Sequence, residues 1–376
     1  MVKICHIISG FFRNDTRIFD KQCKSLLKEG YDVCILTNDG IHDEIKDGIK
    51  IYSSDKFYQK RLSTILKAKS IFIEKAIEIN ADIYQLHGPE LIPLGLRLKK
   101  LGKIIFYDAH EDLPRQILEK GWIPVLFRKP LSIASELYLK YSLRKFDEIF
   151  SVTPHIVDKL KKLTDSVTMV TNYPIIDHND TLSFNEYILR ENIICYSGTV
   201  YLGSNQEYII NAIANIDNID NINYHIAGYI DEEYYKTLST VCSLQKVTFL
   251  GRIAKTQMRE FYQKAVVGLA IHDYAHNLGH KVGSLGSTKF FEYMKVGLPI
   301  ICSDFDLWSE IIKKYNCGIC VQPNNIEQIE SAIRFILEDK EKAYEMGQNG
   351  KNAILTEFNW SAQERIYLKV FSKYCF

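Results

Sequence analysis

The chain has 376 residues, of which 46% are hydrophobic and 25% are charged, and its formal net charge is +1. This length suits two domains that each bury a core of their own, and the composition is typical of a soluble globular protein. A charge so close to zero gives no general argument for nucleic acid as a partner, and no apolar stretch approaches the length that spans a bilayer.

The cysteines and the first residues indicate a cytoplasmic protein. The nine cysteines are odd in number and scattered through apolar runs, which is typical of free thiols in a reducing compartment. The apolar run that begins at Met1 is short, contains His6 and lacks a small-residue cleavage site. We therefore expect a first buried strand there and not a signal peptide.

The first half of the chain predicts a parallel α/β sheet. An apolar strand, an amphipathic helix and a second apolar strand follow one another, and this rhythm favours parallel strands joined by helices. The first helix is expected at Thr16–Lys28. The strands are expected at Lys3–Ser9, Asp32–Thr37, Ala81–His87, Lys103–Tyr107, Glu148–Val152 and Val167–Val170.

Polar residues gather where these strands end, which is where open α/β sheets bind ligands. In the first loop, Asp15 and Arg17 are either part of a site or a helix cap with a solvated arginine. His110 is either a cleft residue or a cap of the next helix. The GxGxxG fingerprint is absent, which argues against a dehydrogenase. The candidates are Gly10, Asp15, Arg17, His87, Asp108, His110 and Glu111.

The segment 114–146 is rich in aromatic and basic residues. A helix of this composition could lie on an anionic membrane surface, or it could be a solvated face that covers a core. Residues 177–191 are polar and irregular, which is typical of an interdomain linker.

The second half repeats the alternation of strands and helices. Strands are expected at Ile193–Tyr196, Tyr224–Ala227, Val247–Leu250, Val266–Ile271, Leu298–Cys302 and Gly318–Val321. Helices are expected at Met258–Lys264, Thr288–Lys295, Asn325–Glu338 and Lys340–Glu357, with a terminal helix after Phe358.

The stretch Gly283–Asp304 carries the clearest chemistry. A Gly/Ser loop leads into the helix at Thr288–Lys295, and backbone N–H groups at such a helix start attract anions. Lys289 adds a positive charge in the first turn, and Glu292 adds a carboxylate one turn later. The sequence therefore predicts an anion site at this helix.

Three further patterns are interpreted as structural. Cys317 and Cys320 form a CxxC with no second pair, in a strand-like run. Histidines recur every fourth residue from His272 to His280, but Gly279 favours a loop over a helix there. Asp304–Asp306 reads DFD, a pattern that binds metal in other proteins, and we interpret it as coincidence.

Several of these motifs carry a family resemblance. The segment Ser287–Met294, followed by Gly297–Ile301 and Ser303–Asp304, resembles the donor-site motif of the retaining glycosyltransferases of family 4. Asp15–Ile18 and Asp108–Glu111 resemble two further motifs of that family.

The resemblance implies the α/β GT-B fold, with two Rossmann-like domains whose parallel sheets face a central cleft. The expected domains are 1–180 for the acceptor and 181–357 for the nucleotide-sugar donor, with the helix 358–376 crossing back to the first.

The resemblance also implies roles for single residues. Glu292 would bind the ribose of the donor, and Lys289 with the loop amides would hold its diphosphate. His110 would orient the sugar or the acceptor, and Arg17 would supply a second cation. No metal or other cofactor is implied. The expected donor residues are Gly198, Thr199, Gly251, Arg252, Ile253, Ser284, Leu285, Gly286, Ser287, Lys289 and Glu292.

Three positions depart from the family pattern. Thr199 and Ser204 stand where the family places an Arg and a Lys, and Ser284 stands where it places the first of two glutamates. Some relatives also lack that first glutamate, so the departure does not by itself predict inactivity.

The expected function is retaining transfer of a hexose from a UDP- or GDP-sugar to a glycan or lipid-linked acceptor. By family resemblance this would serve bacterial surface polysaccharide or glycolipid synthesis, with a possible contact at the cytoplasmic face of the membrane. The alternatives are a catalytically silent member that acts as a scaffold and, more remotely, a sugar-nucleotide epimerase. The sequence does not identify the sugar, the acceptor or the oligomeric state.

Overall fold

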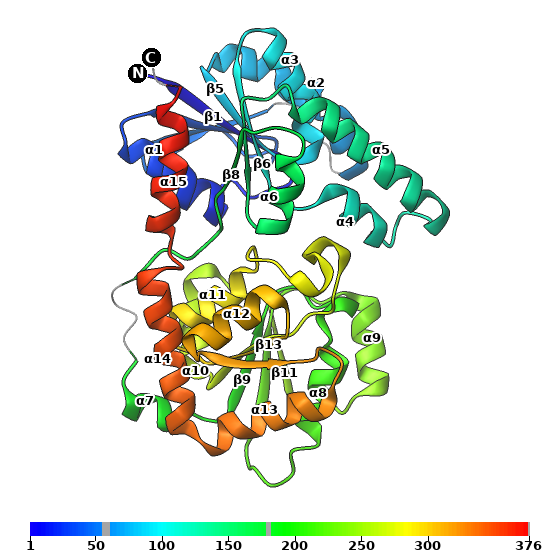
Figure 1. Cartoon of the computed structure of the whole chain (residues 1–376), viewed down its shortest axis with the longest axis vertical. Coiled ribbons are helices and arrows are strands. Elements are labelled where there is room, and N and C mark those ends of the chain that lie inside the picture. The colour runs from blue at the N-terminus through cyan, green and yellow to red at the C-terminus, as the bar shows by residue number, and fades with distance from the viewer. Residues whose placement is uncertain (55–60, 178–181, 375–376) are drawn as a thin grey trace. The chain divides into compact units, whose positions relative to one another are not determined.

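The structure is a computed structural model that describes residues 1–54, 61–177 and 182–374, with side chains omitted for 61–66. The chain forms two compact units (Figure 1). The first unit comprises Met1–Asn172 and Trp360–Phe376, and the second comprises Tyr173–Asn359. The division therefore falls earlier than the expected boundary at 180, and the segment that returns to the first unit begins at Trp360.

The expected linker at 177–191 is not irregular throughout. Ser183 and Glu186 form a capping box at the start of helix α7 (Phe184–Ile188), which lies in the second unit. Residues 178–181 of the expected linker lie outside the described residues.

The first unit contains an eight-stranded sheet in the order β3-β4-β2-β1-β5-β6-β7-β8. All neighbouring strands are parallel except β3 and β4, which are antiparallel. The strands are β1 (Lys3–Ile8), β2 (Asp32–Thr37), β3 (Glu44–Lys46), β4 (Ile49–Ser53), β5 (Ile83–His87), β6 (Ile104–Ala109), β7 (Glu148–Ser151) and β8 (Val167–Met169).

Both faces of the middle of this sheet are buried, because side chains of the inner strands alternate between two cores, whereas the edge strand β3 is exposed. In β1, Cys5 and Ile7 belong to one core and Ile4 and Ile8 to the other. The helical elements are η1 (Thr16–Cys23), α1 (Lys24–Lys28), α2 (Arg61–Ile79), η2 (Pro89–Leu91), α3 (Ile92–Lys100), α4 (Leu113–Glu119), α5 (Val125–Leu143), α6 (Pro154–Lys161) and α15 (Trp360–Ser372).

Helix α15 completes the second of these cores. Figure 1 shows it beside α1, and Trp360 Nε1 donates a hydrogen bond to Ser25 Oγ at 3.0 Å. Tyr367 and Phe371 are buried in the same core. The last helix is therefore an integral part of the first unit.

The second unit contains a six-stranded sheet, all parallel, in the order β11-β10-β9-β12-β13-β14. The strands are β9 (Ile193–Ser197), β10 (Asn223–Ala227), β11 (Val247–Gly251), β12 (Val267–Ala270), β13 (Ile300–Ser303) and β14 (Gly318–Val321). Beside α7, the helical elements are η3 (Leu202–Ser204), α8 (Gln206–Ala214), α9 (Glu232–Val241), η4 (Lys255–Gln257), α10 (Met258–Lys264), η5 (His276–Leu278), η6 (His280–Val282), α11 (Thr288–Lys295), α12 (Asp306–Tyr315), α13 (Ile326–Glu338) and α14 (Lys340–Thr356).

Both strand orders reverse direction beside the first strand of their sheet. β1 lies between β2 and β5, and β9 lies between β10 and β12. At such a switch point the loops after neighbouring strands diverge, and the crevice outside the carboxyl ends of the strands binds ligands in open α/β folds. The candidate residues of each half follow these strands.

Candidate functional site

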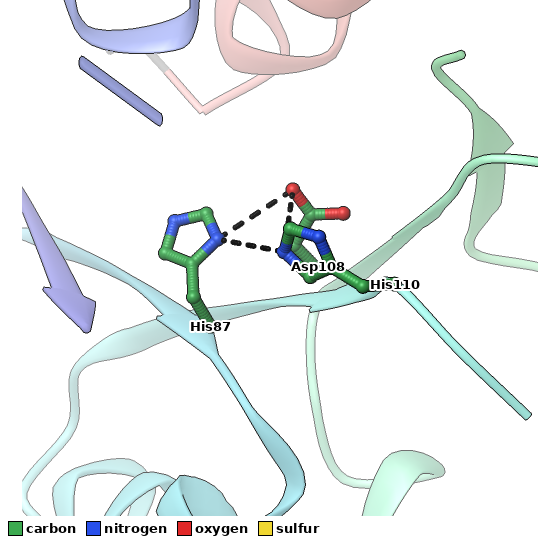
Figure 2. Close-up of side chains that lie close together, drawn as sticks. All are labelled: His87, Asp108 and His110. Atoms are coloured by element: carbon green, nitrogen blue, oxygen red, sulfur yellow. Dashed lines mark hydrogen bonds and ion pairs between the residues drawn. The ribbon is translucent and has the colours of Figure 1, made fainter. Parts of the chain in front are cut away.

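In the first unit, parallel register brings the polar strand ends together. His87 ends β5 and is aligned with Asp108 of β6. His110 follows directly after β6, and Figure 2 shows the two imidazoles and the carboxylate converging. Arg17 reaches the same carboxylate from η1.

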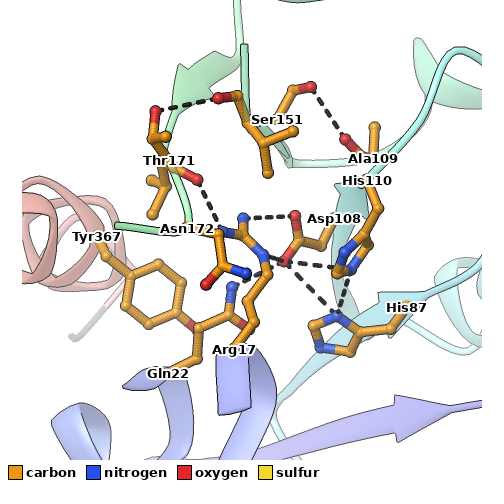
Figure 3. Close-up of polar contacts among 12 residues, drawn as sticks. Arg17, Gln22, His87, Asp108, Ala109, His110, Ser151, Thr171, Asn172 and Tyr367 are labelled. Carbon is orange, nitrogen blue, oxygen red and sulfur yellow. Dashed lines mark hydrogen bonds and ion pairs between the residues drawn. The ribbon is translucent and has the colours of Figure 1, made fainter. Parts of the chain in front are cut away.

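Arg17 and Asp108 form a buried ion pair (Figure 3). Arg17 Nε and Nη2 donate to the two carboxylate oxygens at 3.0 and 2.9 Å, and Nη1 donates to the carbonyl of Val170 at 2.9 Å. The Arg17 side chain is only 3% exposed. Burial alone would raise the pKa of Asp108, but the neighbouring guanidinium outweighs it and holds that pKa far below its usual value.

The structure decides between the two interpretations of the first loop only in part. Asp15 does cap η1, since its carboxylate accepts hydrogen bonds from the backbone N–H groups of Arg17 and Ile18 at 2.9 and 3.1 Å. The interpretation of Arg17 as a solvated side chain is wrong, because Arg17 is buried. Its charge is balanced by Asp108, so the structure does not present it as a free cation.

The sequence analysis missed three residues, two with amide side chains and one with a hydroxyl, that support Asp108. Gln22 Nε2 donates to Asp108 Oδ2 at 2.7 Å (Figure 3). Gln85 Nε2 donates to Gln22 Oε1 at 3.1 Å, and Tyr367 Oη donates to Gln85 Oε1 at 2.7 Å. The signal available was Gln85, a polar residue at the centre of an apolar strand.

The expected helix at Thr16–Lys28 begins as a π-helix over Thr16–Cys23. Its wider turn places residues five apart on one side, so Arg17 and Gln22 both face Asp108. In an α-helix the same two side chains would diverge. The local departure from α-helical geometry therefore builds the ion-pair network.

Three histidines form a row beside the ion pair. His6 Nδ1 lies 3.0 Å from His87 Nε2, and His87 Nδ1 lies 3.3 Å from His110 Nε2. Burial lowers the pKa of His6 to about 3 and lowers those of His87 and His110, partly offset by the Asp108 charge. All three rings are therefore neutral near pH 7, and His110 is the partly exposed one, packed against Phe11.

His110 does not cap the helix that follows it. Asp112 is the cap of α4, and its carboxylate also binds Lys159 Nζ at 2.9 Å. Glu111 is exposed, and Gly10 is exposed with a positive φ of 75°. The alternative reading of His110 as a helix cap is wrong.

In the second unit, three glycines bring the strand ends into backbone contact. The Gly228 N–H donates to the Gly251 carbonyl at 2.7 Å, and the Gly198 N–H donates to the Ala227 carbonyl at 2.9 Å. A Cβ on Gly228, whose φ is +150°, would lie 1.9 Å from the Gly198 oxygen. Only glycine fits there, so this edge of the sheet presents backbone.

Lys289 lies against these glycines at the carboxyl ends of the strands. Its Nζ lies 3.7 Å from the centre of the Tyr196 ring. A Cβ on Gly198 would lie 3.0 Å from the same Nζ. Within the described part of the chain, Lys289 forms no hydrogen bond and no ion pair. Burial lowers the pKa of its ammonium to about 7. A half-buried cation with no carboxylate is a site for an external anion.

The loop before α11 is fixed by hydrogen bonds within it and from Trp308. Ser284 Oγ accepts a hydrogen bond from the Gly286 N–H at 3.0 Å, and Trp308 Nε1 donates to the Ser284 carbonyl at 2.9 Å. Leu285 is buried. Ser287 precedes α11 without capping it through its side chain, so the first N–H groups of the helix remain available to a ligand.

Glu292 follows Lys289 by three residues, on the same side of α11. It is partly buried and has no hydrogen-bond or ion-pair partner among the described residues. The helix is fixed by the next residue, because Tyr293 Oη accepts the Ser197 N–H at 3.0 Å and its ring packs on Gly268.

The structure explains how the chain accommodates two departures from the family pattern. Ser204 is fully buried, and its hydroxyl bonds the backbone N–H and carbonyl of Tyr201 at 3.1 and 2.6 Å, which closes the turn η3. Thr199 is exposed beside it. Arg252 is exposed over the Tyr229 ring, and Ile253 is partly buried.

The three remaining motifs do not assemble a metal site. His272 follows β12, while His276 and His280 begin two separate turns, η5 and η6. Asp304 is bonded to Lys281 and Tyr274. In the described chain none of these residues joins a cluster suited to a metal. The thiol of Cys320 contacts Cys302 at 3.8 Å, whereas Cys317 is buried.

The whole chain has the GT-B fold. It matches the structure of a TarM variant from S. aureus, in complex with Fondaparinux, alpha-GlcNAc-glycerol and UDP, with a TM-score of 0.75. The match covers 99% of this chain and 100% of that one at 12% sequence identity. This likeness shows the architecture.

The sequence gives a family match over part of the chain. Residues 180–353, a little under half of the chain, match the family described as glycosyl transferases group 1. Uncharacterized glycosyltransferase MJ1069 of Methanocaldococcus jannaschii is 25% identical over 183 residues, which are 48% of this chain and 45% of that protein.

A second relative is the GDP-mannose-dependent alpha-(1-6)-phosphatidylinositol monomannoside mannosyltransferase of Mycobacterium tuberculosis. It is 24% identical over 176 residues, which are 46% of this chain and 44% of that protein. The resemblance to family 4 is consistent with this relative. The chain spans about half the length of the curated relatives it matches.

Proposed function

We propose that the protein transfers a sugar from a nucleotide-sugar to a glycan or lipid-linked acceptor, with retention of the anomeric configuration. The observation that carries this proposal is the pair Lys289 and Glu292 on α11. Both are charged and partly buried, and neither forms a hydrogen bond or an ion pair with another described residue. The family match and the fold are consistent with it.

The donor nucleotide would bind at the carboxyl end of the second sheet. Glu292 would accept hydrogen bonds from the ribose hydroxyls, and Lys289 with the N–H groups at the start of α11, after the loop 284–287, would hold the diphosphate. The backbone of Gly251–Ile253 would meet the nucleobase. The two nucleotides named for the similar proteins are GDP, in the mannosyltransferase, and UDP, in the TarM complex, so we propose one of these as the donor nucleotide.

The departing diphosphate would be stabilised without a metal, by Lys289 and the start of α11. We identify no enzyme nucleophile among the described side chains of the first unit, so the leaving phosphate would accept the proton of the acceptor hydroxyl. His110, partly exposed and neutral, would orient the sugar or acceptor through its free ring nitrogen. Arg17 would act only by fixing Asp108.

The test is a binding screen of the purified protein against UDP, GDP, ADP and their sugars, with and without a divalent ion. A ligand that binds the folded state raises its unfolding temperature. Glu292→Ala should weaken binding of the preferred nucleotide and lower turnover, whereas Lys313→Ala, an exposed lysine of α12, should leave both unchanged. Full binding and turnover in Glu292→Ala would overturn the assignment.

A catalytically silent scaffold is the second candidate. Thr199, Ser204 and Ser284 support it, because two cations and one acid of the family pattern are replaced. Nucleotide binding without transfer to any acceptor would favour it. An epimerase would convert the sugar-nucleotide with no second substrate, so product analysis without acceptor tests that reading.

We also propose that the first unit docks on an anionic membrane surface from the cytoplasm, through α4 and α5. The expected segment 114–146 forms these two helices, and α5 buries only Leu139, Ser142 and Leu143 (Figure 1). Leu126 is 80% exposed. Besides Val125 at the start of the helix, the large exposed apolar and aromatic side chains of α5 are Leu126, Phe127, Leu131, Ile133, Leu137, Tyr138 and Tyr141.

These side chains share one broad face of α5, opposite its buried residues. Exposed Lys129 and Lys140 border this face, and Arg144 and Lys145 follow at the end of the helix. An apolar face with a basic border suits an interfacial helix on anionic lipid. No described helix is long and apolar enough to cross a membrane.

Vesicle sedimentation tests this docking. The protein should bind vesicles that contain phosphatidylglycerol more than pure phosphatidylcholine, and salt should weaken the binding. A Leu126→Ser, Leu137→Ser double variant should lose it, whereas Leu189→Ser, an equally exposed leucine of the second unit, should not. Equal sedimentation of all variants would refute the role of α5.

A further inference from the structure

The two histidines and the carboxylate at the ends of β5 and β6 have the spacing of metal ligands (Figure 2). His87 Nδ1 and His110 Nε2 lie 3.3 Å apart, and Asp108 Oδ2 lies 3.6 and 3.7 Å from them. We propose that His87, Asp108 and His110 bind one divalent cation of the zinc class. This site is separate from the donor residues on α11 and does not depend on the proposed transfer.

The three distances select a coordination geometry. An ion just above the plane of this triangle would lie about 2.1 Å from each atom, within the usual range of zinc bonds to imidazole nitrogen and carboxylate oxygen. At such bond lengths, ligand atoms lie about 3.4 Å apart on a tetrahedral ion and about 3.0 Å apart on an octahedral one. The observed separations therefore fit a tetrahedral ion that has three protein ligands and one open position.

The surroundings supply a second layer of hydrogen bonds. Metal-bound histidines usually donate their other ring N–H to a fixed acceptor. His87 Nε2 lies 3.0 Å from His6 Nδ1, which is placed to accept that hydrogen. This bond selects the tautomer in which His87 Nδ1 has its lone pair directed at the centre of the triangle. His110 is the partly exposed ligand, so the open position lies on its side of the cluster.

Arg17 acts on this site in two opposite ways. Its bidentate bond keeps Asp108 ionised and fixes the carboxylate, and a carboxylate must be ionised to bind a metal. The guanidinium charge also repels a second cation in the same buried cluster. Gln22 shares Asp108 Oδ2 with Arg17, so the metal would be a third partner of that oxygen. We therefore expect an exchangeable ion and not a permanently bound structural one.

The test uses the whole chain with Zn²⁺ or Co²⁺ alone, and with no nucleotide present. The measurements use a His276→Ala, His280→Ala double variant as the background. It removes two imidazoles whose ring centres lie 4.2 Å apart and that could bind metal by themselves. Calorimetry with Zn²⁺ should give one ion per chain. The visible absorption of bound Co²⁺ should have the intensity of a tetrahedral complex.

In this background, His110→Ala should weaken binding by at least about 100-fold, since it removes a direct ligand. His225→Ala, a partly buried histidine of β10, is the matched control and should bind as the background does. X-ray absorption of the zinc-loaded background should show two imidazole ligands, a readout that needs no variant at the site. Absence of binding, an octahedral Co²⁺ spectrum, or unchanged affinity in His110→Ala would each overturn the proposal.

Discussion

Burial of Lys289 without a countercharge predicts that nucleotide binding takes up a proton. The pKa of Lys289 is lowered by burial from 10.5 to about 7, so half of the free protein carries a neutral amine at pH 7. A bound diphosphate would favour the charged form and return the pKa toward its ordinary value. Binding should then take up about 0.5 proton at pH 7 and about 0.9 at pH 8.

The affinity follows the same titration. The charged fraction of Lys289 falls from about 0.9 at pH 6 to about 0.1 at pH 8, so the nucleotide should bind roughly tenfold more weakly at the higher pH. The assay is calorimetry in two buffers with different heats of ionisation, because the difference in heat measures the protons taken up. The same lysine makes the free protein more stable as pH rises above 7, since the unfolded chain then binds more protons.

Lys289→Arg is the control, because arginine stays charged over this whole range. It should abolish the additional proton uptake while the phosphate of the nucleotide still titrates. Lys289→Met should weaken binding at every pH. Equal proton uptake by the natural protein and Lys289→Arg would refute a neutral lysine in the free site.

Three further predictions concern the two sheet edges. Arg17→Gln leaves Asp108 buried without its countercharge, so urea denaturation should show a loss of about 3–5 kcal/mol in unfolding free energy; an unchanged midpoint would contradict a buried ion pair. The lowered pKa of His6, about 3, means that the unfolded chain binds more protons below pH 6.5. Stability should therefore fall between pH 6.5 and pH 3, and His6→Gln should show a shallower fall in thermal unfolding. Gly228→Ala, which forces a Cβ against a carbonyl oxygen, should abolish the thermal shift by UDP and GDP, and a retained shift would show that this edge can adapt.

The order of strands and helices could be predicted from the sequence because apolar runs and glycine breaks are local signals. β2 at Asp32–Thr37 and α10 at Met258–Lys264 have the expected bounds. The loop and helix around Lys289 were also predictable, since a Gly/Ser turn before a helix has a fixed physical meaning.

The supporting residues could not be predicted in the same way. Gln22 and Tyr367 meet through Gln85 only after three distant segments have packed, and the π-helical turn that directs Gln22 toward Asp108 has no simple sequence signature. The two interpretations of Arg17, as a site residue or as a solvated side chain, could not be separated from the sequence for the same reason. Its partner lies 91 residues away and becomes visible only in the folded sheet.

The return of α15 to the first unit sets an order of events during synthesis. Trp360 bonds Ser25 across 335 residues, and Tyr367 bonds Gln85 across 282. Because a growing chain emerges from its N-terminus, the first sheet leaves the ribosome with part of one apolar face uncovered, beside η1 and α1, while the entire second unit is being made. A chaperone or the nascent second unit must keep that face from aggregating until α15 arrives, so stop codons near Trp360 would yield chains that fold one unit and leave the other insoluble.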